Sequence, residues 1–323
     1  MKYKTDPQEV KVWVVGDEVN PDAKNAIIVR HYLKDSNGNN TRITVPGMND
    51  VKKGGRVGDT VKIKLSEHQA PTGYTMVPGQ SDQEWTLTPD SGKEIIFYYT
   101  ANELNNIKVE FIRIKDGTLY QTPVKTDIPN GHTNEILEIN DNSDYIKGVM
   151  PKGYHLAKEN DLTNLKDENG NSINLPVTQP SNITFDGVER TEKIYIVGDA
   201  NSSITVNFVD VKTGQVVLSD RPQGKTGDEL DLESCKNDGD YIYKKLQDLQ
   251  VKNYKYASGN ELKEGQKQPG KVTYGDPSVP VIKTVYVYKP EASARTITIK
   301  YVGAGGYTTD TTLQVREGQS YSI

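Results

Sequence analysis

Ile27-Ile-Val-Arg-His-Tyr32 is an alternating stretch that opens a repeated unit of this chain. Its further copies are Ile107-Lys-Val-Glu-Phe111, Ile204-Thr-Val-Asn-Phe208 and Ile297-Thr-Ile-Lys-Tyr301. Roughly 70–85 residues after each of the first three openings comes a closing stretch, namely Glu94-Ile-Ile-Phe-Tyr-Tyr99, Glu192-Lys-Ile-Tyr-Ile-Val197 or Lys283-Thr-Val-Tyr-Val-Tyr288. Apolar and polar residues that alternate with a period of two are typical of strands with one buried face. A repeat of this size predicts a small domain used several times, which serves reach and multivalent contact.

Three further landmarks recur in the same order inside each unit. A reverse turn follows the opening strand at Asp35–Gly38, Lys115–Gly117 and Lys212–Gly214. A glycine-rich turn follows at Gly55–Asp59, Gly131–Glu135 and Gly224–Asp228, where Asn134 replaces the second glycine because Asn also tolerates a positive φ. An aromatic landmark follows at Pro71–Tyr74, Pro151–Tyr154 and Val251–Tyr254. We expect Tyr74, Tyr154 and Tyr254 to pack their rings at equivalent positions in their own units.

Helix signals are few. The best lies at Asp238–Gln250, where Ile242, Leu246 and Leu249 share one helical face and Asp238 or Asp240 can cap the start. A shorter helical turn is predicted around Tyr145–Met150, and Ser66–Ala70 predicts a turn only. The order is hairpin, helical turn and then further strands, with the closing strand back in the middle. We therefore predict an α+β, mainly β fold made of tandem ubiquitin-like β-grasp modules in an elongated rod.

The two ends of the chain fit the same pattern. Lys11-Val-Trp-Val-Val-Gly-Asp17 matches Lys193-Ile-Tyr-Ile-Val-Gly-Asp199, which closes the second full unit. Residues 1–19 are therefore predicted to be the closing strand of a preceding repeat. Residues 295–323 supply an opening strand, a turn and a second strand, and only Glu317-Gly318 remains there of the glycine-rich turn. We expect the chain to be a fragment of a longer array.

Composition limits the possible functions. Only 34% of the 323 residues are hydrophobic, which favours several thin cores over a large one, and the net charge of −5 argues against nucleic acid as a partner. No run approaches the roughly 20 apolar residues of a membrane helix, so we expect no membrane insertion and a monomer. The single cysteine, Cys235, is expected to be half-buried and incidental. The four histidines, His31, His68, His132 and His155, are scattered over two units.

Motifs for catalysis and cofactors are absent from the sequence, so we predict no enzyme, no catalytic residue, no cofactor and no metal site. Asp35-Ser-Asn-Gly-Asn39 and Asp167-Glu-Asn-Gly-Asn171 faintly resemble Ca²⁺ loops but lack the spaced carboxylates and closing Glu, so they are interpreted as turns. Tyrosine is abundant, with 19 residues, and suits half-buried strand faces as well as sugar and protein surfaces. The residues that bind a ligand are unknown at this stage.

The landmarks together resemble the mucin-binding (MucBP and Mub-type) repeats of cell-wall-anchored adhesins of Gram-positive bacteria. The resemblance rests on the opening Ile-x-Val-x-Tyr/Phe strand, the Gly-x-x-Gly-Asp turn, the Pro-x-Gly-Tyr landmark and closing strands such as Ile95–Thr100. The longer units also carry Ile183-Thr-Phe-Asp-Gly187 before the closing strand. The family implies β-grasp folds, export, extracellular attachment to the cell wall and adhesion to host mucin or other glycoproteins. The domains that it implies are residues 1–19 (a closing strand), 26–102 (a MucBP-like repeat), 106–199 and 203–290 (two Mub-type repeats) and 295–323 (a truncated repeat).

Leu65-Ser-Glu-His-Gln-Ala-Pro-Thr-Gly-Tyr74 resembles the glutamate-containing motif of pilin-type domains that join Lys to Asn by an isopeptide bond. In those domains the buried carboxyl shuttles protons beside a neutral Lys in an apolar pocket. No Lys occupies an obvious core position in the opening strand, and no Asn closes the last strand. The preferred interpretation of Glu67 is a solvated turn residue.

The expected function is therefore weak, multivalent binding of host mucin or other glycoproteins by a fragment of a surface adhesin. Two alternatives stay open. The repeats are spacers that project a separate adhesive domain, or an exposed strand edge binds a host protein such as immunoglobulin.

Overall fold

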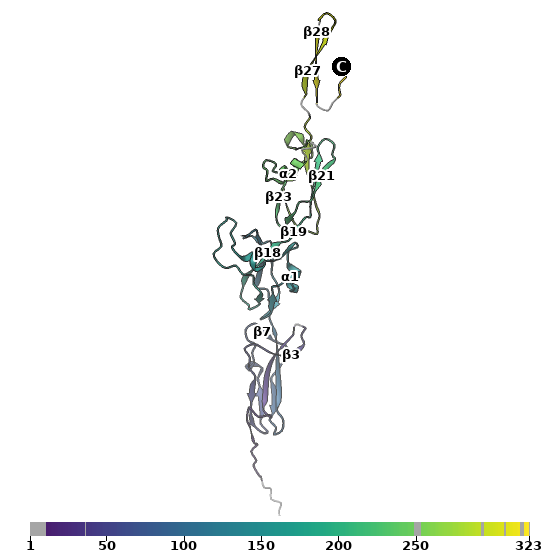
Figure 1. Ribbon diagram of the computed structural model, residues 1–323. Coiled ribbons are helices and arrows are strands. Elements are labelled where there is room, and N and C mark those ends of the chain that lie inside the picture. The colour runs from purple at the N-terminus through teal and green to yellow at the C-terminus, as the bar shows by residue number, and fades with distance from the viewer. Residues whose placement is uncertain are drawn as a thin grey trace, which may run out of the picture. The chain divides into compact units, whose positions relative to one another are not determined.

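The computed structural model describes residues 11–35, 37–248, 253–291, 294–306, 308–316 and 320–322 (Figure 1). Its described part is mainly β, as predicted. The chain divides into two compact units. One comprises Met1–Ile112, Gln121–Val149 and Leu175–Tyr195, and the other Arg113–Tyr120, Met150–Asn174 and Ile196–Ile323. Among the described residues, no helix is long and apolar enough to cross a membrane.

The first sheet has five strands in the order β3-β2-β9-β7, with β4 beside β2 (Figure 1). Its strands are β2 (Ile27–Lys34), β3 (Asn40–Thr44), β4 (Val51–Lys53), β7 (Tyr74–Met76) and β9 (Lys93–Ala101). The opening strand β2 and the closing strand β9 pair in parallel from Ile27↔Lys93 to Leu33↔Tyr99. The prediction that the closing strand lies in the middle is confirmed here. A separate pair joins β6 (Thr60–Ile63) to β8 (Gln83–Thr86), and a single 3₁₀ turn, η1, covers Leu65–Glu67.

The second sheet repeats this order with β12-β11-β18-β16, and β13 lies beside β11. Its strands are β11 (Ile107–Lys115), β12 (Thr118–Leu119), β13 (Lys125–Asp127), β16 (Tyr154–Leu156) and β18 (Arg190–Gly198). The short helix α1 spans Asp144–Val149, where a helical turn was predicted (Figure 1). The 3₁₀ turn η2 covers Glu159–Leu162, and β15 (Ile136–Glu138) pairs with β17 (Asn182–Thr184).

The third sheet has the order β21-β20-β26-β24. Its strands are β20 (Ile204–Asp210), β21 (Val216–Asp220), β24 (Lys255–Tyr256) and β26 (Val281–Tyr288), with β20 and β26 parallel. A further pair joins β23 (Glu229–Asp231) to β25 (Lys271–Thr273), and the 3₁₀ turn η4 covers Gly259–Glu261.

Helix α2 (Tyr241–Asp248) covers the core of the third sheet. Its Ile242 and Leu246 are buried with Phe208 and Val285, as the predicted helical face requires. The predicted third position, Leu249, lies outside the described residues. Asp240 precedes the helix, but its carboxylate accepts hydrogen bonds from the backbone of the preceding loop, at Lys236 and Asn237, rather than from the helix. Cys235 is half-buried at the edge of this core, and burial raises the pKa of its thiol.

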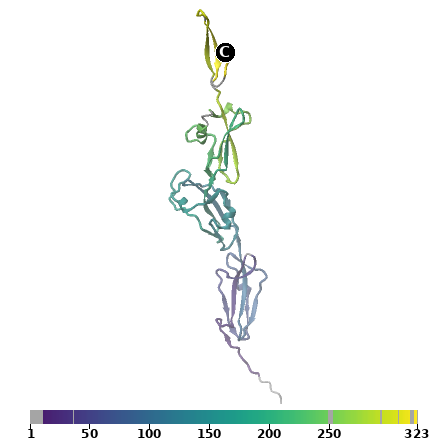
Figure 2. The same cartoon turned by 45° about the vertical axis from the view of Figure 1, so that its right-hand side comes forward.

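The last two described strands, β27 (Arg295–Val302) and β28 (Thr308–Val315), form an antiparallel hairpin (Figure 2). The apolar side chains of Ile297, Tyr301 and Val302 on β27 are 40%, 47% and 72% exposed. The predicted remnant of the glycine-rich turn, Glu317-Gly318, lies outside the described residues.

The predicted strand at Lys11–Asp17 does not form in the described structure. The first strand is β1 (Glu18–Val19), and Trp13 and Val14 before it are 89% and 87% exposed. A strand needs a partner strand for its backbone hydrogen bonds, and no described strand pairs with Lys11–Asp17. Residues 1–10 lie outside the described part, so the assignment of 1–19 to a preceding repeat stays a prediction, as do the other domain boundaries.

The segments before the first, second and third sheets are paired rather than bare linkers. Each contributes a two-residue strand that pairs with the start of a glycine-rich turn. The three pairs are β1 with β5 (Gly55–Arg56), β10 (Glu103–Leu104) with β14 (Gly131–His132), and β19 (Ala200–Asn201) with β22 (Gly224–Lys225).

Close packing explains the first glycine of the second and third glycine-rich turns. A Cβ at Gly131 would collide with the ring of Phe185, and one at Gly224 with the ring of Tyr274. Phe185 is fully buried and Tyr274 is 2% exposed, so neither ring can retreat into solvent. A methyl group at either glycine would overpack a finished core.

We expect Gly131→Ala to lower the free energy of unfolding by about 1–3 kcal/mol, the usual cost of overpacking. Gly148→Ala is the control, because Gly148 lies in α1 with no atom within 4 Å of the place that a Cβ would take, and Ala favours the helix. Urea unfolding followed by far-ultraviolet circular dichroism would compare the two. Equal stability of Gly131→Ala and the parent chain would contradict the packing argument.

Candidate functional site

Each glycine-rich turn has the same internal bonding. Its fourth residue, Gly58, Asn134 or Gly227, has a φ of 93°, 66° or 83°. The acid that follows accepts a hydrogen bond from a backbone N–H three residues earlier, with pairs Asp59–Arg56, Glu135–His132 and Asp228–Lys225 at 2.8–3.1 Å. The prediction that Asn134 takes the place of a glycine with positive φ is confirmed. The acid of the motif therefore closes its own turn.

In the first compact unit, the glycine-rich turn Gly131–Glu135 contacts the aromatic landmark Pro71–Tyr74. The Asn134 side-chain amide donates to the Tyr74 hydroxyl over 2.7 Å. The backbone N–H of Thr133 donates to the Asn102 carbonyl, and the N–H of Asn102 donates to the Gly73 carbonyl, both over 2.9 Å. We call this set of contacts the first clasp. The Tyr74 ring is 8% exposed in the core of the first sheet, so its predicted structural role is confirmed, and its hydroxyl has a further role that the sequence did not indicate.

In the second compact unit, an equivalent second clasp contains charged groups. Arg113 donates to the carbonyl of Gly227 and to the Asp228 carboxylate, the latter over 2.8 Å. The Lys115 ammonium lies 3.1 Å from the same carboxylate. Tyr154 is half-buried beside Gly227, and burial raises the pKa of its hydroxyl although Arg113 opposes the shift.

Tyr254 of the third aromatic landmark behaves differently. Its ring packs against the core of the third sheet, as predicted, and its hydroxyl bonds to Asp210 of the same sheet. Asn253 before it has a φ of 56° and takes the conformation of Gly73 and Gly153.

A cavity of about 650 Å³ opens beside the first clasp. Its lining residues come from the ends of β2, β7 and β9 and from β10 and β14: Lys34, Asp35, Thr75, Thr100, Ala101, Asn102, Glu103 and His132. A second cavity of about 400 Å³ shares Glu103 and His132 and extends the lining to Leu104, Asn105, Asn130, Gly131 and Glu135. Because Glu103 and His132 are register partners, the two cavities meet across β10 and β14. We call them together the junction cleft.

The junction cleft presents several hydrogen-bonding side chains. The Thr75 hydroxyl donates to the Asn102 side-chain carbonyl over 2.7 Å, which leaves the Asn102 amide group to bind a ligand. His132 Nδ1 lies 3.0 Å from a Glu135 oxygen. The lining thus offers hydroxyl, amide, imidazole and carboxylate groups. Such a set suits a hydroxyl-rich ligand held by hydrogen bonds.

Charges in the junction cleft are mostly negative. Asp35, Glu103 and Glu135 contribute carboxylates, and Lys34 contributes the ammonium among the lining side chains. Hydrogen bonds from the side chain and backbone of Asn39 lower the pKa of Asp35, so its carboxylate stays charged. The cleft therefore disfavours anionic ligands.

The two loops that faintly resemble Ca²⁺ sites are turns, as predicted. Asp35 accepts hydrogen bonds from the N–H groups of Asn37 and Asn39 over 2.9 and 2.7 Å. Asp167 accepts from Asn169 and Asn171 in the same way over 2.9 and 2.8 Å. Ser36 of the first loop lies outside the described residues. In the described part of the chain, no group of three or more His, Cys, Asp or Glu is placed to hold a metal ion.

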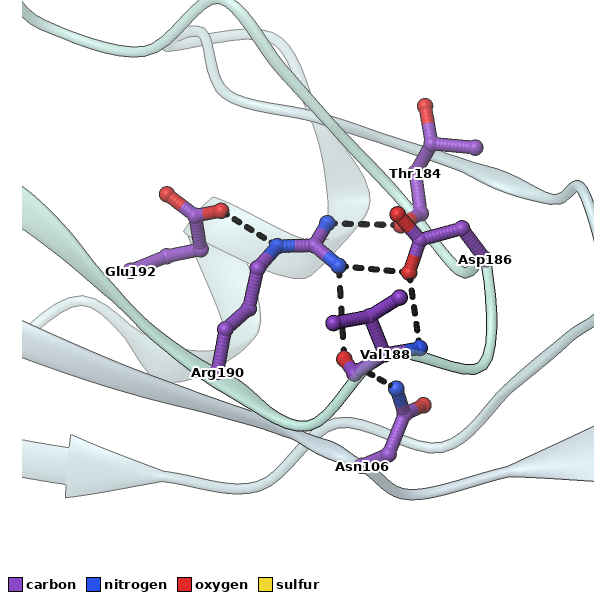
Figure 3. A network of polar contacts seen from close by, with 6 residues as sticks. All are labelled: Asn106, Thr184, Asp186, Val188, Arg190 and Glu192. Atoms are coloured by element: carbon purple, nitrogen blue, oxygen red, sulfur yellow. Dashed lines mark hydrogen bonds and ion pairs between the residues drawn. The ribbon is translucent and has the colours of Figure 1, made fainter.

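Figure 3 shows a charged network around Arg190 at the start of β18. The guanidinium lies 2.6 Å from both Glu192 and Asp186 and donates to the Thr184 carbonyl over 2.8 Å. Asn106 adds a side-chain hydrogen bond to the Val188 carbonyl. These bonds tie the loop after Ile183-Thr-Phe to the closing strand, so the guanidinium serves its own fold.

The isopeptide hypothesis gains no support from the position of Glu67. Its side chain is 49% exposed, and its carboxylate lies 3.9 Å from the Lys53 ammonium, which is a loose surface pair. Proton shuttling in such a bond needs a buried carboxyl and a desolvated Lys. Glu67 is a solvated turn residue, as preferred from the sequence.

Comparison with known proteins gives little further guidance. No family model and no curated protein matches the chain. Among solved structures it is similar to the Bacillus anthracis TIE protein, with 12% sequence identity and a TM-score of 0.20. The match covers 85% of this chain and 51% of that one, so the chain spans about half the length of that protein. A TM-score this low carries no argument about fold or function.

We expect Tyr74→Phe and Asn134→Gly each to loosen the first clasp. Each change removes one side of a single hydrogen bond, worth about 1 kcal/mol, and a glycine in place of Asn134 would retain the positive φ. Hydrogen exchange at the Thr133 amide, which bonds across the clasp, is the measurement, and the double variant should be no looser than the worse single one.

Tyr98→Phe on the same sheet is the matched control, and it should leave exchange at Thr133 unchanged. Fully additive effects of Tyr74→Phe and Asn134→Gly would show that the two side chains act independently and would contradict the clasp.

Proposed function

We propose that this chain is part of an extracellular, cell-wall-attached adhesin of a Gram-positive bacterium, and that its repeats bind host mucin glycoproteins weakly and multivalently. The repeats are tandem ubiquitin-like β-grasp modules in an elongated rod. Support comes from the recurring order of motifs in the sequence and from the three sheets in which the closing strand lies in the middle. The two clasps further support a chain whose successive modules are tied together.

The junction cleft is the observation that carries the binding proposal. Its lining offers hydrogen-bonding groups to the hydroxyl groups of a glycan, and we expect each single site to bind weakly. Repetition compensates for weakness, because linked sites can raise avidity by about 10²–10⁴ where the geometry permits. The ligand-binding residues in this proposal are Thr75, Asn102, Glu103 and His132.

Charge selects among the glycans of mucin. The cleft carries three carboxylates against one ammonium, and the whole chain has a net charge of −5. Sialylated and sulfated chains are anionic and are repelled at low salt. Neutral hexoses and N-acetylhexosamines are therefore the favoured ligands.

We expect the chain to be retained better on sialidase-treated mucin than on untreated mucin, since removal of sialic acid removes the repulsion. His132→Ala and Asn102→Ala should each reduce retention several-fold, whereas Glu138→Gln, an exposed change outside the cleft, should not. Surface plasmon resonance on both mucin surfaces is the measurement.

The main alternative is a spacer that projects a separate adhesive domain. The clasps favour it specifically, because they restrain the chain without needing a ligand. Retention on neither mucin surface above that of an unrelated β-rich protein would support the spacer and reject the glycan proposal. A radius of gyration near the roughly 20 Å of one 323-residue globule would reject the rod in either case.

A further inference from the structure

Two histidines far apart in the sequence meet in the core of the first sheet. His31 Nε2 lies 2.9 Å from His68 Nδ1, and the residues are only 2% and 4% exposed. The ring of His68 stacks on Phe97 with centroids 5.0 Å apart, and the Tyr99 hydroxyl donates to the His68 carbonyl over 2.6 Å. The sequence-based description of the histidines as scattered is therefore wrong for this pair.

The pair is built for two neutral rings. One ring nitrogen donates and the other accepts, so at most one further proton can be added before the hydrogen bond is lost. The outward nitrogens, His31 Nδ1 and His68 Nε2, are buried without a hydrogen-bond partner of good geometry among the described residues. A proton added there would bring a charge into the core without solvation.

The groups around the pair compensate only in part for the burial of a charge. Burial lowers the pKa of both histidines, and each cationic ring would also repel a neighbour, His68 for His31 and Lys53 for His68. The backbone of Asn49 and the Asp50 carboxylate favour charged His31, and Glu67 favours charged His68 more strongly than Lys53 opposes it, but burial is the largest effect on both rings. Phe97 and Tyr99, on β9, supply no anion at neutral pH.

The equivalent position in the other sheets holds a different residue. The fifth residue of the opening strand is His31 in the first sheet but Phe111 and Phe208 in the second and third, and both phenylalanines are fully buried. An aromatic ring of this size is therefore compatible with the fold. Only in the first sheet can this position gain a charge.

We propose that the His31–His68 pair is an acid-sensitive latch, which holds β2, β9 and η1 together at neutral pH and releases them as pH falls. The unfolded chain binds protons at the ordinary histidine pKa near 6.5, whereas the folded pair binds them only at lower pH. The stabilisation is thus complete above about pH 6.5 and is lost as pH falls below that value.

Separation of β2 from β9 would also change the junction cleft. Lys34 ends β2 three residues after His31 and Asp35 comes directly after it, and Thr100 and Ala101 end the partner strand β9. Loosening of this strand pair would disturb those four lining residues. The latch itself does not depend on what the cleft binds.

The test uses the whole chain and two readouts. ¹⁵N NMR of the imidazole nitrogens between about pH 7.5 and 4.5 should show both pair members neutral near pH 6.5. Hydrogen exchange, corrected for the intrinsic pH dependence, should show the β2–β9 amides losing protection as the pH falls through this range. The opening constant should rise by up to about tenfold per pH unit for each histidine. The β20–β26 amides are the internal control, because residues 203–290 contain no histidine.

Two variants complete the test. His31→Phe with His68→Phe should abolish the extra pH dependence of β2–β9, since neither buried ring is left to gain a proton. His155→Gln, a change at a histidine that faces Asp199 rather than the core of the first sheet, should retain it. If the double variant does not fold, the NMR titration decides alone. Protonation of either ring at or above about pH 6.5 would overturn the latch. The same would follow if the hydrogen-exchange protection of the β2–β9 amides changed with pH in the same way as that of the β20–β26 amides.

Discussion

The parallel pairing of an opening strand with its closing strand is the constraint on which the first and third sheets depend. In the first sheet β2 and β9 are adjacent although a whole unit separates them in the sequence, and β20 and β26 are related in the same way. The chain between the two strands must therefore return so that the start of the closing strand lies beside the start of the opening strand. The alternating burial of β9, with Ile95, Phe97 and Tyr99 all nearly inaccessible, supplies the apolar area that offsets the entropy of closing so long a loop.

That pairing also explains why the contacts between sheets recur. Because the closing strand lies centrally, its end emerges in the middle of a sheet beside the aromatic landmark, and the next segment starts there. The backbone N–H of Asn102 donates to the Gly73 carbonyl and that of Asp199 to the Gly153 carbonyl, so both segments leave their sheets by the same bond. The glycine-rich turn then receives the segment as a short strand. The aromatic landmark of one unit and the glycine-rich turn of the next look like separate turn signals in the sequence, but in the structure they form a single contact.

Local chemistry could be predicted from the sequence, but contacts between distant segments could not. Alternation located β2, β9 and β20, and the tolerance of Asn for positive φ identified the role of Asn134. The bond from Asn134 to Tyr74 spans 60 residues, and nothing in either local pattern points to the other. His31 and His68 escaped notice for the same reason, since each looks like an ordinary polar residue until the fold brings them together. The prediction at Lys11–Asp17 was wrong for a different reason, because an alternating pattern forms no strand unless another strand pairs with it, and no described strand does.

The junction cleft, the binding site in the proposed function, is also formed by such long-range contacts. Its side chains come from the ends of strands and from the clasp, where backbone geometry is determined by the fold rather than by the lining residues themselves. Thr75 and Asn102 are already bonded to one another, so part of the cost of ordering them is met during folding. A cleft arranged in this way needs no dedicated loop and no apolar pocket. In the proposed function a single such site binds weakly, and linked sites would raise the avidity of the chain.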